Sequence, residues 1–318
     1  MTFNVSKYLH EEHIVLYHDC DEKFLKERYI NSTKVIKYTE IVDVNGRKPD
    51  FLSDLKCIDL DTALSYESVL IVLAVEDFKN IKNAVAKIGE KPFDHITHFG
   101  PNINVHVLKI MGYDDYYDFC NNHITFDKSL TGICTVTRFD NGSFKNNVVR
   151  IGNIRIVNRL EIVFYGHNGY VVIGNGNSFV QTRIEITTKG NVIIGDDNMF
   201  SWRISLQQPD HHLIFDVDTR KRINKYKNIT IGNHVWVGTG VVLLGGGDIP
   251  DNCIIGYGSI TSRKFTETNC VLAGAPAKIV RRNVLWSRDN QRFDYNDFSQ
   301  CQDQTALKYM TADEERRF

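Results

Sequence analysis

The chain lacks the cysteine pattern of a disulfide framework or of a structural zinc site. Its seven cysteines are scattered over 318 residues, odd in number, and never spaced as C-x-x-C. This distribution is typical of free thiols in a reducing compartment. We therefore expect a cytoplasmic protein.

Long apolar runs and an excess of one charge are also missing. No run of about 18 apolar residues occurs, and the N-terminal segment has no apolar core long enough for a signal peptide. Any contact with the inner membrane is therefore expected to be peripheral. The 38 lysines and arginines are balanced by 39 aspartates and glutamates, so no overall field would attract nucleic acid.

Residues 1–120 alternate between strand-like and helix-like segments. Apolar runs at Ile14–Tyr17 and Val69–Val75 suit buried strands, and a further strand is expected around Val35–Val42. Helical spacing follows at Glu22–Tyr29 and Asp77–Ile88. This alternation predicts a small α/β, Rossmann-like domain.

The first strand-to-helix turn of that domain has no glycine. It reads Tyr17-His18-Asp19-Cys20-Asp21-Glu22, and its three carboxylates would repel a phosphate that a glycine-rich loop would bind. The turn favours docking, oligomer support or partner binding over nucleotide binding. Residues 121–147 are expected to be a connector.

From residue 148 to 286, apolar residues recur every six positions. The clearest register is Ile231, Val237, Leu243, Ile249 and Ile255, and glycine follows three of these five. Neither helical nor strand periodicity fits six, so the pattern predicts a repeat architecture with three steps per triangular coil. An ordinary sandwich would place its turns every 8–12 residues instead.

This hexad pattern resembles the hexapeptide-repeat acyltransferases, and the resemblance implies a left-handed parallel β-helix. The expected fold class is therefore mainly β, with the β-helix after the small α/β domain. Residues 287–318 are expected to form a C-terminal helix or tail.

A polar insertion interrupts the hexads between Leu206 and Ile231 and carries Asp210-His211-His212-Leu213-Ile214-Phe215-Asp216. Together with Trp236, it resembles the sugar O-acetyltransferases that modify capsule and sialic-acid polymers. The resemblance implies that Asp210, His212 and Trp236 are catalytic. The family often has proline where this chain has Leu213, which can adopt the same extended backbone.

His212 is the expected general base, because a neutral imidazole can accept the proton of an attacking sugar hydroxyl near neutral pH. Asp210 or Asp216 would orient it, with Asp210 favoured. Trp236 would pack against the acceptor or donate to the oxyanion; a structural corner role is equally open. His211 competes with His212, and only the motif register separates them. No metal is expected, since adjacent histidines of a strand point to opposite faces.

The segment Gly274-Ala275-Pro276-Ala277-Lys278 resembles the ending of the same superfamily, where acetyl-CoA lies between subunits. Carried over, the backbone of Gly240, Ser259 and Ala277 would contact the coenzyme, and Lys278 with Arg281 or Arg282 would bind its phosphates. A groove on one prism needs a second wall, so a homotrimer is expected.

The expected activity is transfer of acetyl from acetyl-CoA to a sugar hydroxyl of a bacterial surface polysaccharide or its precursor. N-acetylation of a nucleotide-linked amino sugar is the alternative. A third hypothesis is a non-catalytic β-helix scaffold.

Overall fold

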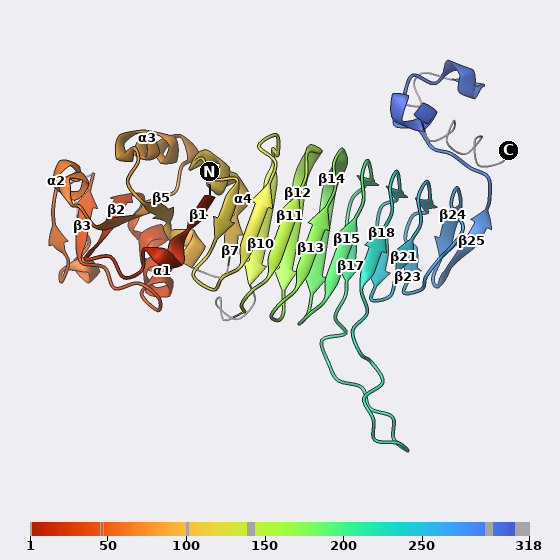
Figure 1. The fold of residues 1–318 in the computed structure, drawn as a ribbon, viewed down its shortest axis with the longest axis horizontal. Coiled ribbons are helices and arrows are strands. Elements are labelled where there is room, and N and C mark those ends of the chain that lie inside the picture. Colours follow the sequence, from red (N-terminus) through yellow and green to blue (C-terminus); the bar gives the residue numbers. More distant parts are fainter. Residues whose placement is uncertain are drawn as a thin grey trace. The chain divides into compact units, whose positions relative to one another are not determined.

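The computed structural model describes residues 2–44, 46, 48–99, 102–138, 144–289 and 295–308 (Figure 1). The chain divides into two compact units. The first comprises Met1–Lys128, Gly132–Arg150 and Glu161–Gly169, and the second comprises Ser129–Thr131, Ile151–Leu160 and Tyr170–Phe318. No helix among the described residues is long and apolar enough to cross a membrane.

The first unit contains a parallel five-stranded sheet in the order β4-β3-β2-β5-β6. Its strands are β2 (His13–Asp19), β3 (Glu40–Asp43), β4 (Lys56–Cys57), β5 (Val69–Val75) and β6 (Phe93–His95). Its helices are α1 (Glu22–Ser32), α2 (Leu60–Ser65) and α3 (Phe78–Ile88). All seven residues of β5 are buried, as a central parallel strand requires.

Helix α3 is limited at both ends by its capping residues. The Asp77 side chain caps α3 by accepting from the amides of Lys79 and Asn80, and Gly89 ends the helix with a φ of 67°. The strand expected at Val35–Val42 is shorter, because Val35 and Ile36 still donate to Ser32 O at the end of α1. A sheet with its first long strand in the middle is common in doubly wound folds; the Rossmann-like assignment stays a prediction.

The rest of this part of the chain is built from short elements. They are β1 (Thr2–Asn4), β7 (Asn102–Asn104), α4 (Val105–Ile110), β8 (Asp115–Tyr117), β9 (His123–Phe126) and β10 (Ile133–Arg138), with the 3-10 turns η1 (Val5–Lys7), η2 (Asp50–Leu52) and η3 (Ile96–Phe99). The segment 121–147, for which a connector is predicted, thus contains two strands. The predicted domain limits stay predictions.

The second unit is a stack of parallel coils with three sides. Strands β13 (Tyr170–Ile173), β15 (Asn191–Ile194), β18 (Ile229–Ile231) and β21 (Asp248–Ile249) form side one. Side two holds β16 (Met199–Phe200), β19 (Trp236–Val237), β22 (Ile254–Ile255) and β24 (Val271–Gly274), and side three holds β17 (Ile204–Gln207), β20 (Val242–Leu244) and β23 (Ile260–Thr261). The long strand β14 (Asn177–Ile186) pairs with both β16 and β17.

Three further strands complete the chain: β11 (Val148–Ile151) and β12 (Ile154–Phe164), which contain residues of both units, and β25 (Ala277–Arg281), which runs antiparallel to β24. A 3-10 turn, η5 (Phe298–Gln300), follows near the C-terminus.

The six-residue register lies inside the prism. Ile231, Val237, Leu243, Ile249 and Ile255 are each at most 1 % exposed, and Ile231 pairs with Ile249, one 18-residue coil later. Burying such a side chain contributes about 1.5–3 kcal/mol, so the ladder supplies much of the cohesion of the coils. The parallel coil is therefore confirmed, whereas its left-handed sense stays a prediction.

Glycine after the register residue is required by the next coil. A Cβ on Gly238 would lie 2.7 Å from Ile255 O, and one on Gly232 would lie 2.8 Å from the Asp251 amide nitrogen. Both contacts are too short for any side chain. Close approach of neighbouring coils, more than the corner conformation, explains these glycines.

Candidate active site

A long hairpin interrupts the coils between β17 and β18. Ile194 pairs with Ile231, 37 positions on, whereas regular coils repeat every 18, so the insertion adds 19 residues. We call residues 210–228 the arm; Figure 1 shows it leaving the stack. Its two strands are joined by a bridge between Phe215 and Arg222.

The tip of the arm is closed by a local turn. Asp216 Oδ1 accepts from both the amide and the hydroxyl of Thr219, each at 2.7 Å, and these bonds lower the pKa of the Asp216 carboxyl. The Asp216 amide donates to Lys221 O at 2.9 Å. Asp216 is thereby a structural turn residue, and its carboxylate does not contact the His212 ring.

Asn224 holds the base of the arm together. Its Nδ2 donates to Asp210 Oδ2 at 3.1 Å and to His212 O at 2.7 Å, and its Oδ1 accepts from the Ile214 amide at 2.8 Å. Asp210 therefore bonds Asn224 and not the imidazole it was expected to orient. Sequence reasoning did not single out Asn224, because its partners lie 10 to 14 positions away.

The two adjacent histidines point to different surroundings. His211 has a φ of 60° and turns its ring back to β14, where Nε2 lies 3.1 Å from Glu185 Oε2. Arg183 Nε donates to the other oxygen of Glu185 at 2.6 Å. His212 is exposed, and no side chain of the described residues bonds its ring.

Trp236 lies on the side of the prism opposite the arm. In each coil the chain runs along sides one, two and three, and the arm replaces a corner between side three (β17) and side one (β18). Trp236 is the first residue of β19, on side two, and is 38 % exposed. One chain alone therefore does not bring His212 and Trp236 together.

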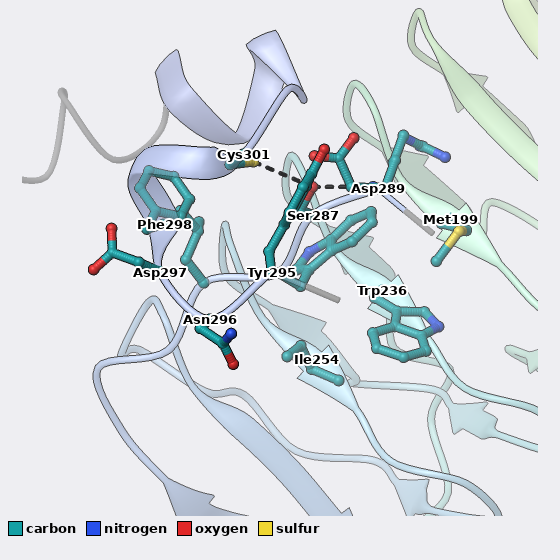
Figure 2. A pocket seen from close by; sticks show the side chains of 13 residues that line it. Met199, Trp236, Ile254, Ser287, Asp289, Tyr295, Asn296, Asp297, Phe298 and Cys301 are labelled. Carbon is teal, nitrogen blue, oxygen red and sulfur yellow. Dashed lines mark hydrogen bonds between the residues drawn. The ribbon is translucent and has the colours of Figure 1, made fainter. Parts of the chain in front are cut away.

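A cavity of about 1020 Å³ opens beside Trp236 (Figure 2). One wall is the ladder Met199–Trp236–Ile254, whose members pair directly along side two. The other wall is the C-terminal segment with Trp286, Tyr295 and Phe298. Aromatic faces beside amide and carboxylate groups are the kind of lining that binds a polar ring compound.

A buried network holds the C-terminal segment against this side. His234 Nδ1 lies 2.7 Å from Asp197 Oδ2, and Trp286 Nε1 donates to His234 O at 2.8 Å. Arg288 Nε donates to Asp197 Oδ1 at 3.0 Å; burial lowers the pKa of Arg288, and Asp197 partly offsets this. His234 is therefore a packed structural histidine, and residues 285–289 are anchored to the prism.

The expected phosphate contacts lie at the far end of the prism. Lys278 lines a pocket of about 320 Å³ together with Arg263, Lys264 and Arg282. Arg282 is already engaged by Glu267, at 2.6 and 3.0 Å. Lys278 is exposed. Sequence reasoning missed Arg263 and Lys264, which reach this pocket from the loop after β23.

The small residues of the expected coenzyme groove differ in accessibility. Gly240 has a φ of 73° and donates its amide to Trp202 O. Ser259 and Ala277 are both 0 % exposed, and the Ser259 hydroxyl donates to Gly256 O at 2.7 Å. Arg281 is exposed at the end of β25. Coenzyme contact at all four positions stays a prediction.

The described residues hold no group of three or more histidine, cysteine, aspartate or glutamate side chains arranged to bind a metal ion.

Comparison with known proteins places the chain among sugar O-acetyltransferases. No family model matches it. It is 30% identical over 186 residues to the polysialic acid O-acetyltransferase of Neisseria meningitidis, covering 45% of this chain and 86% of that protein. It is 34% identical over 131 residues to the polysialic acid O-acetyltransferase of Escherichia coli O1:K1 / APEC, where the match spans 41% of this chain and only 42% of that enzyme.

Two further matches are a relative and a solved structure. The galactoside O-acetyltransferase of Escherichia coli K12 is 33% identical over 123 residues, covering 37% of this chain and 57% of that enzyme. The crystal structure of the polySia specific acetyltransferase NeuO matches with a TM-score of 0.44 at 27% identity, covering 60% of this chain and 94% of that one. On the Neisseria match, the chain belongs to the family of the polysialic acid O-acetyltransferases and is an acyltransferase.

Proposed function

We propose that the protein transfers acetyl from acetyl-CoA to a sugar hydroxyl of a sialic-acid-type bacterial surface polysaccharide or its precursor. The active site would lie at a seam between copies of the chain in a homotrimer. We place the reaction in the cytoplasm, where acetyl-CoA is available, with any membrane contact peripheral. The family membership supports the acyl transfer and the sugar hydroxyl as acceptor.

The position of the arm carries the proposal of a shared site. The arm emerges at the corner opposite the side that holds Trp236, so a site with both His212 and Trp236 needs the arm of a second copy. The cavity beside Trp236 takes no residue from the arm of its own chain among the described residues.

Exposed apolar side chains on the arm support the same arrangement. Leu213, Phe215 and Val217 are 60, 54 and 90 % exposed. An isolated two-stranded hairpin is at best marginally stable in water, and an apolar patch of this kind marks an interaction site. A neighbouring prism would cover these side chains and fix the geometry of the arm.

Acetyl transfer to a hydroxyl requires a base that accepts the hydroxyl proton. The sugar hydroxyl oxygen bonds to the thioester carbon, its proton passes to the His212 imidazole, and the thiolate of CoA leaves. His212 suits this role because its ring is exposed and makes no bond to a described side chain. Trp236 would pack on the sugar or donate its indole N–H to the developing oxyanion.

Cations at the far end of the prism would receive the phosphates of acetyl-CoA. Lys278 and Arg263 line one pocket with Lys264 and Arg282, which pair with Asp248 and Glu267. Charge-assisted hydrogen bonds from such groups are the usual means of binding a phosphate. Gly240, Ser259, Ala277 and Arg281 would shape or line the groove that leads there.

Mixing two impaired variants tests the shared site. We expect His212→Ala and Trp236→Ala each to have an activity far below that of the wild type. Unfolding and refolding them together in equal amounts should restore activity in about a quarter of the seams, because those seams combine an intact arm with an intact Trp236 from different copies. Mixing without exchange of chains is the control. Activity that never rises above the separate variants would show that the two residues act within one chain or not at all.

A panel of acceptors separates the candidate activities. CoA release accelerated by polysialic acid supports the proposal, whereas acceleration only by an amino-sugar nucleotide would favour N-acetylation. No acceleration by any acceptor would leave a binding scaffold.

A further inference from the structure

We propose that the first unit holds a second, separate site that binds a small carboxylate ligand about the size of one sugar ring, through Arg28. The site is a pocket of about 240 Å³ at the carboxyl ends of β5 and β6. Helices α1 and α3 and the residues of β7 and β10 complete its walls.

The location is where parallel sheets bind ligands. β2 and β5 are neighbours in the sheet, and the strand order runs outward from them in opposite directions. The general rule for such sheets is that a crevice opens at the carboxyl ends of the strands at this reversal point. The pocket contains Glu76, which directly follows β5, and His95, the last residue of β6.

Arg28 is the charged group that lacks a partner here. Its Nε is buried and makes no hydrogen bond to any residue the structure describes. A buried N–H without an acceptor is destabilising, and more so on a charged group. The guanidinium lies 5.9 Å from the ring centroid of Phe24. Its terminal nitrogens make no hydrogen bond or ion pair with a described residue, so they are the donors that a ligand in the pocket would meet. A carboxylate is the acceptor that matches this planar donor set.

The neighbouring titratable groups, Glu76 and His95, do not act as the anionic partner of Arg28. Within the described chain no ion pair joins Arg28 to Glu76. A hydrogen bond with Asp21, together with the charge of Asp21, raises the pKa of Glu76, so Glu76 is the member of that acidic pair that takes up a proton first. Burial lowers the pKa of His95 to about 4, so His95 is neutral near pH 7.

The remaining lining suits a sugar ring. Phe78 and Ile81 give apolar surface, while Asn102, Asn104 and Thr135 bring amide and hydroxyl groups. The volume corresponds to about eight water molecules and lies below the roughly 300–1,000 Å³ of pockets for drug-sized ligands. A nucleotide sugar would not fit, and the acidic turn after β2 would repel its phosphates.

The choice of a sugar acid over other small carboxylates rests on the proposed function, since each residue of polysialic acid carries a carboxylate. A glycan residue bound here would hold an acceptor polymer on the first unit, whereas His212 and Trp236 belong to the second. The free monosaccharide and the polymer both present the carboxylate that Arg28 would bind.

Binding measured on the full-length protein tests the site. We would titrate N-acetylneuraminic acid, a short polysialic acid oligomer and the neutral N-acetylmannosamine by calorimetry and saturation-transfer NMR. We expect both acids to bind and the neutral sugar not to bind. Stronger binding of the oligomer per sialic-acid residue would identify the polymer as the natural source; equal binding per residue would identify the monosaccharide.

Matched variants assign the binding to this pocket. Arg28→Gln should weaken binding of the acid about 10- to 100-fold, whereas Lys26→Gln, which removes an exposed cation from the same helix, should not. Asn102→Ala at the exposed rim gives a second, milder lesion if Arg28→Gln disturbs folding. Equal binding by wild type, Arg28→Gln and Asn102→Ala would overturn the proposal.

His212→Ala distinguishes this inference from the proposed function. It should lower the rate of acetyl transfer by 10²–10⁴-fold and leave acid binding intact. Loss of acid binding in His212→Ala would place the acid in the active site and overturn the second site alone. Intact Arg28-dependent binding in a protein that acetylates no glycan would overturn the proposed function alone.

Discussion

His211 Nε2 lies 3.1 Å from Glu185 Oε2, while the adjacent His212 is exposed and its ring bonds no described side chain. A histidine that contacts a carboxylate is the usual form of a general base. In this chain His211 makes that contact, whereas the motif register favours the adjacent His212 as the general base. Glu185, with Arg183 on its other oxygen, therefore acts on the root of the arm, where His211 anchors the start of the hairpin to β14.

The two histidines should respond differently to substitution. His212→Ala should lower kcat by 10²–10⁴-fold, which corresponds to about 3–5 kcal/mol of transition-state stabilisation. His211→Ala should cost about tenfold, since it only loosens the placement of the arm. CoA release with a polysialic acid acceptor measures both. The reverse order of the two losses would make His211 the base, and Glu185→Gln would then match His211→Ala.

Asn224→Ala should reduce activity without unfolding the protein. The change removes three hydrogen bonds that tie Asp210, His212 and Ile214 together, and a small displacement of a catalytic group can cost about 10²-fold in rate. The free energy of unfolding should change by less than about 0.5 kcal/mol, because the arm lies outside the core. Faster cleavage by trypsin after Arg220 and Lys221 would report the loosened arm. Lys225→Ala is the matched control, and wild-type kcat in Asn224→Ala would refute the positioning role.

Lys278→Ala should raise the KM for acetyl-CoA about 10- to 100-fold and leave kcat nearly unchanged. The physical reason is loss of a cation from the pocket that it shares with Arg263 and Lys264. With dephospho-acetyl-CoA as donor, the KM values of the variant and the wild type should become equal if the lost contact is to the 3′-phosphate. Lys189→Ala, on an exposed corner of the prism, serves as the control. A drop in kcat at constant KM would argue against phosphate binding.

The first unit should lose stability as the pH falls below about 6.5. Burial, with a smaller contribution from His98, lowers the pKa of His95 from 6.5 to about 4, so the unfolded chain binds a proton that the folded chain rejects between these values. The free energy of unfolding should therefore fall by about 2 kcal/mol from this group between pH 7 and pH 5. Urea unfolding at both pH values measures the change. His95→Gln, which cannot titrate, should show a pH dependence smaller by that amount; an unchanged dependence would mean that other groups cause it.

Much of the secondary structure follows from local sequence. The strand Val69–Val75, the helix capped by Asp77 and the ladder from Ile231 to Ile255 each depend on residues close in sequence, so periodicity and capping signals suffice. The sequence pattern does not predict the two strands of the segment 121–147. β9 is a four-residue strand that forms a local hairpin with β8, so its apolar pattern is short, whereas β10 pairs with the more distant β7. The expected link between Asp210 and the imidazole also failed to form, since Asn224 takes that carboxylate from the other strand of the arm.

The sequence by itself determined that the chain forms three-step coils and where these coils are interrupted. It also determined which residues of the insertion have the chemistry for proton transfer. Both follow because a six-residue period and a motif depend only on residues that are close in sequence. Only the tertiary structure decided which histidine meets Glu185, that Lys278 shares its pocket with Arg263 and Lys264, and that the arm leaves the prism opposite Trp236. Those relationships join residues that coil stacking brings together, and stacking is set by packing between coils that no local pattern encodes.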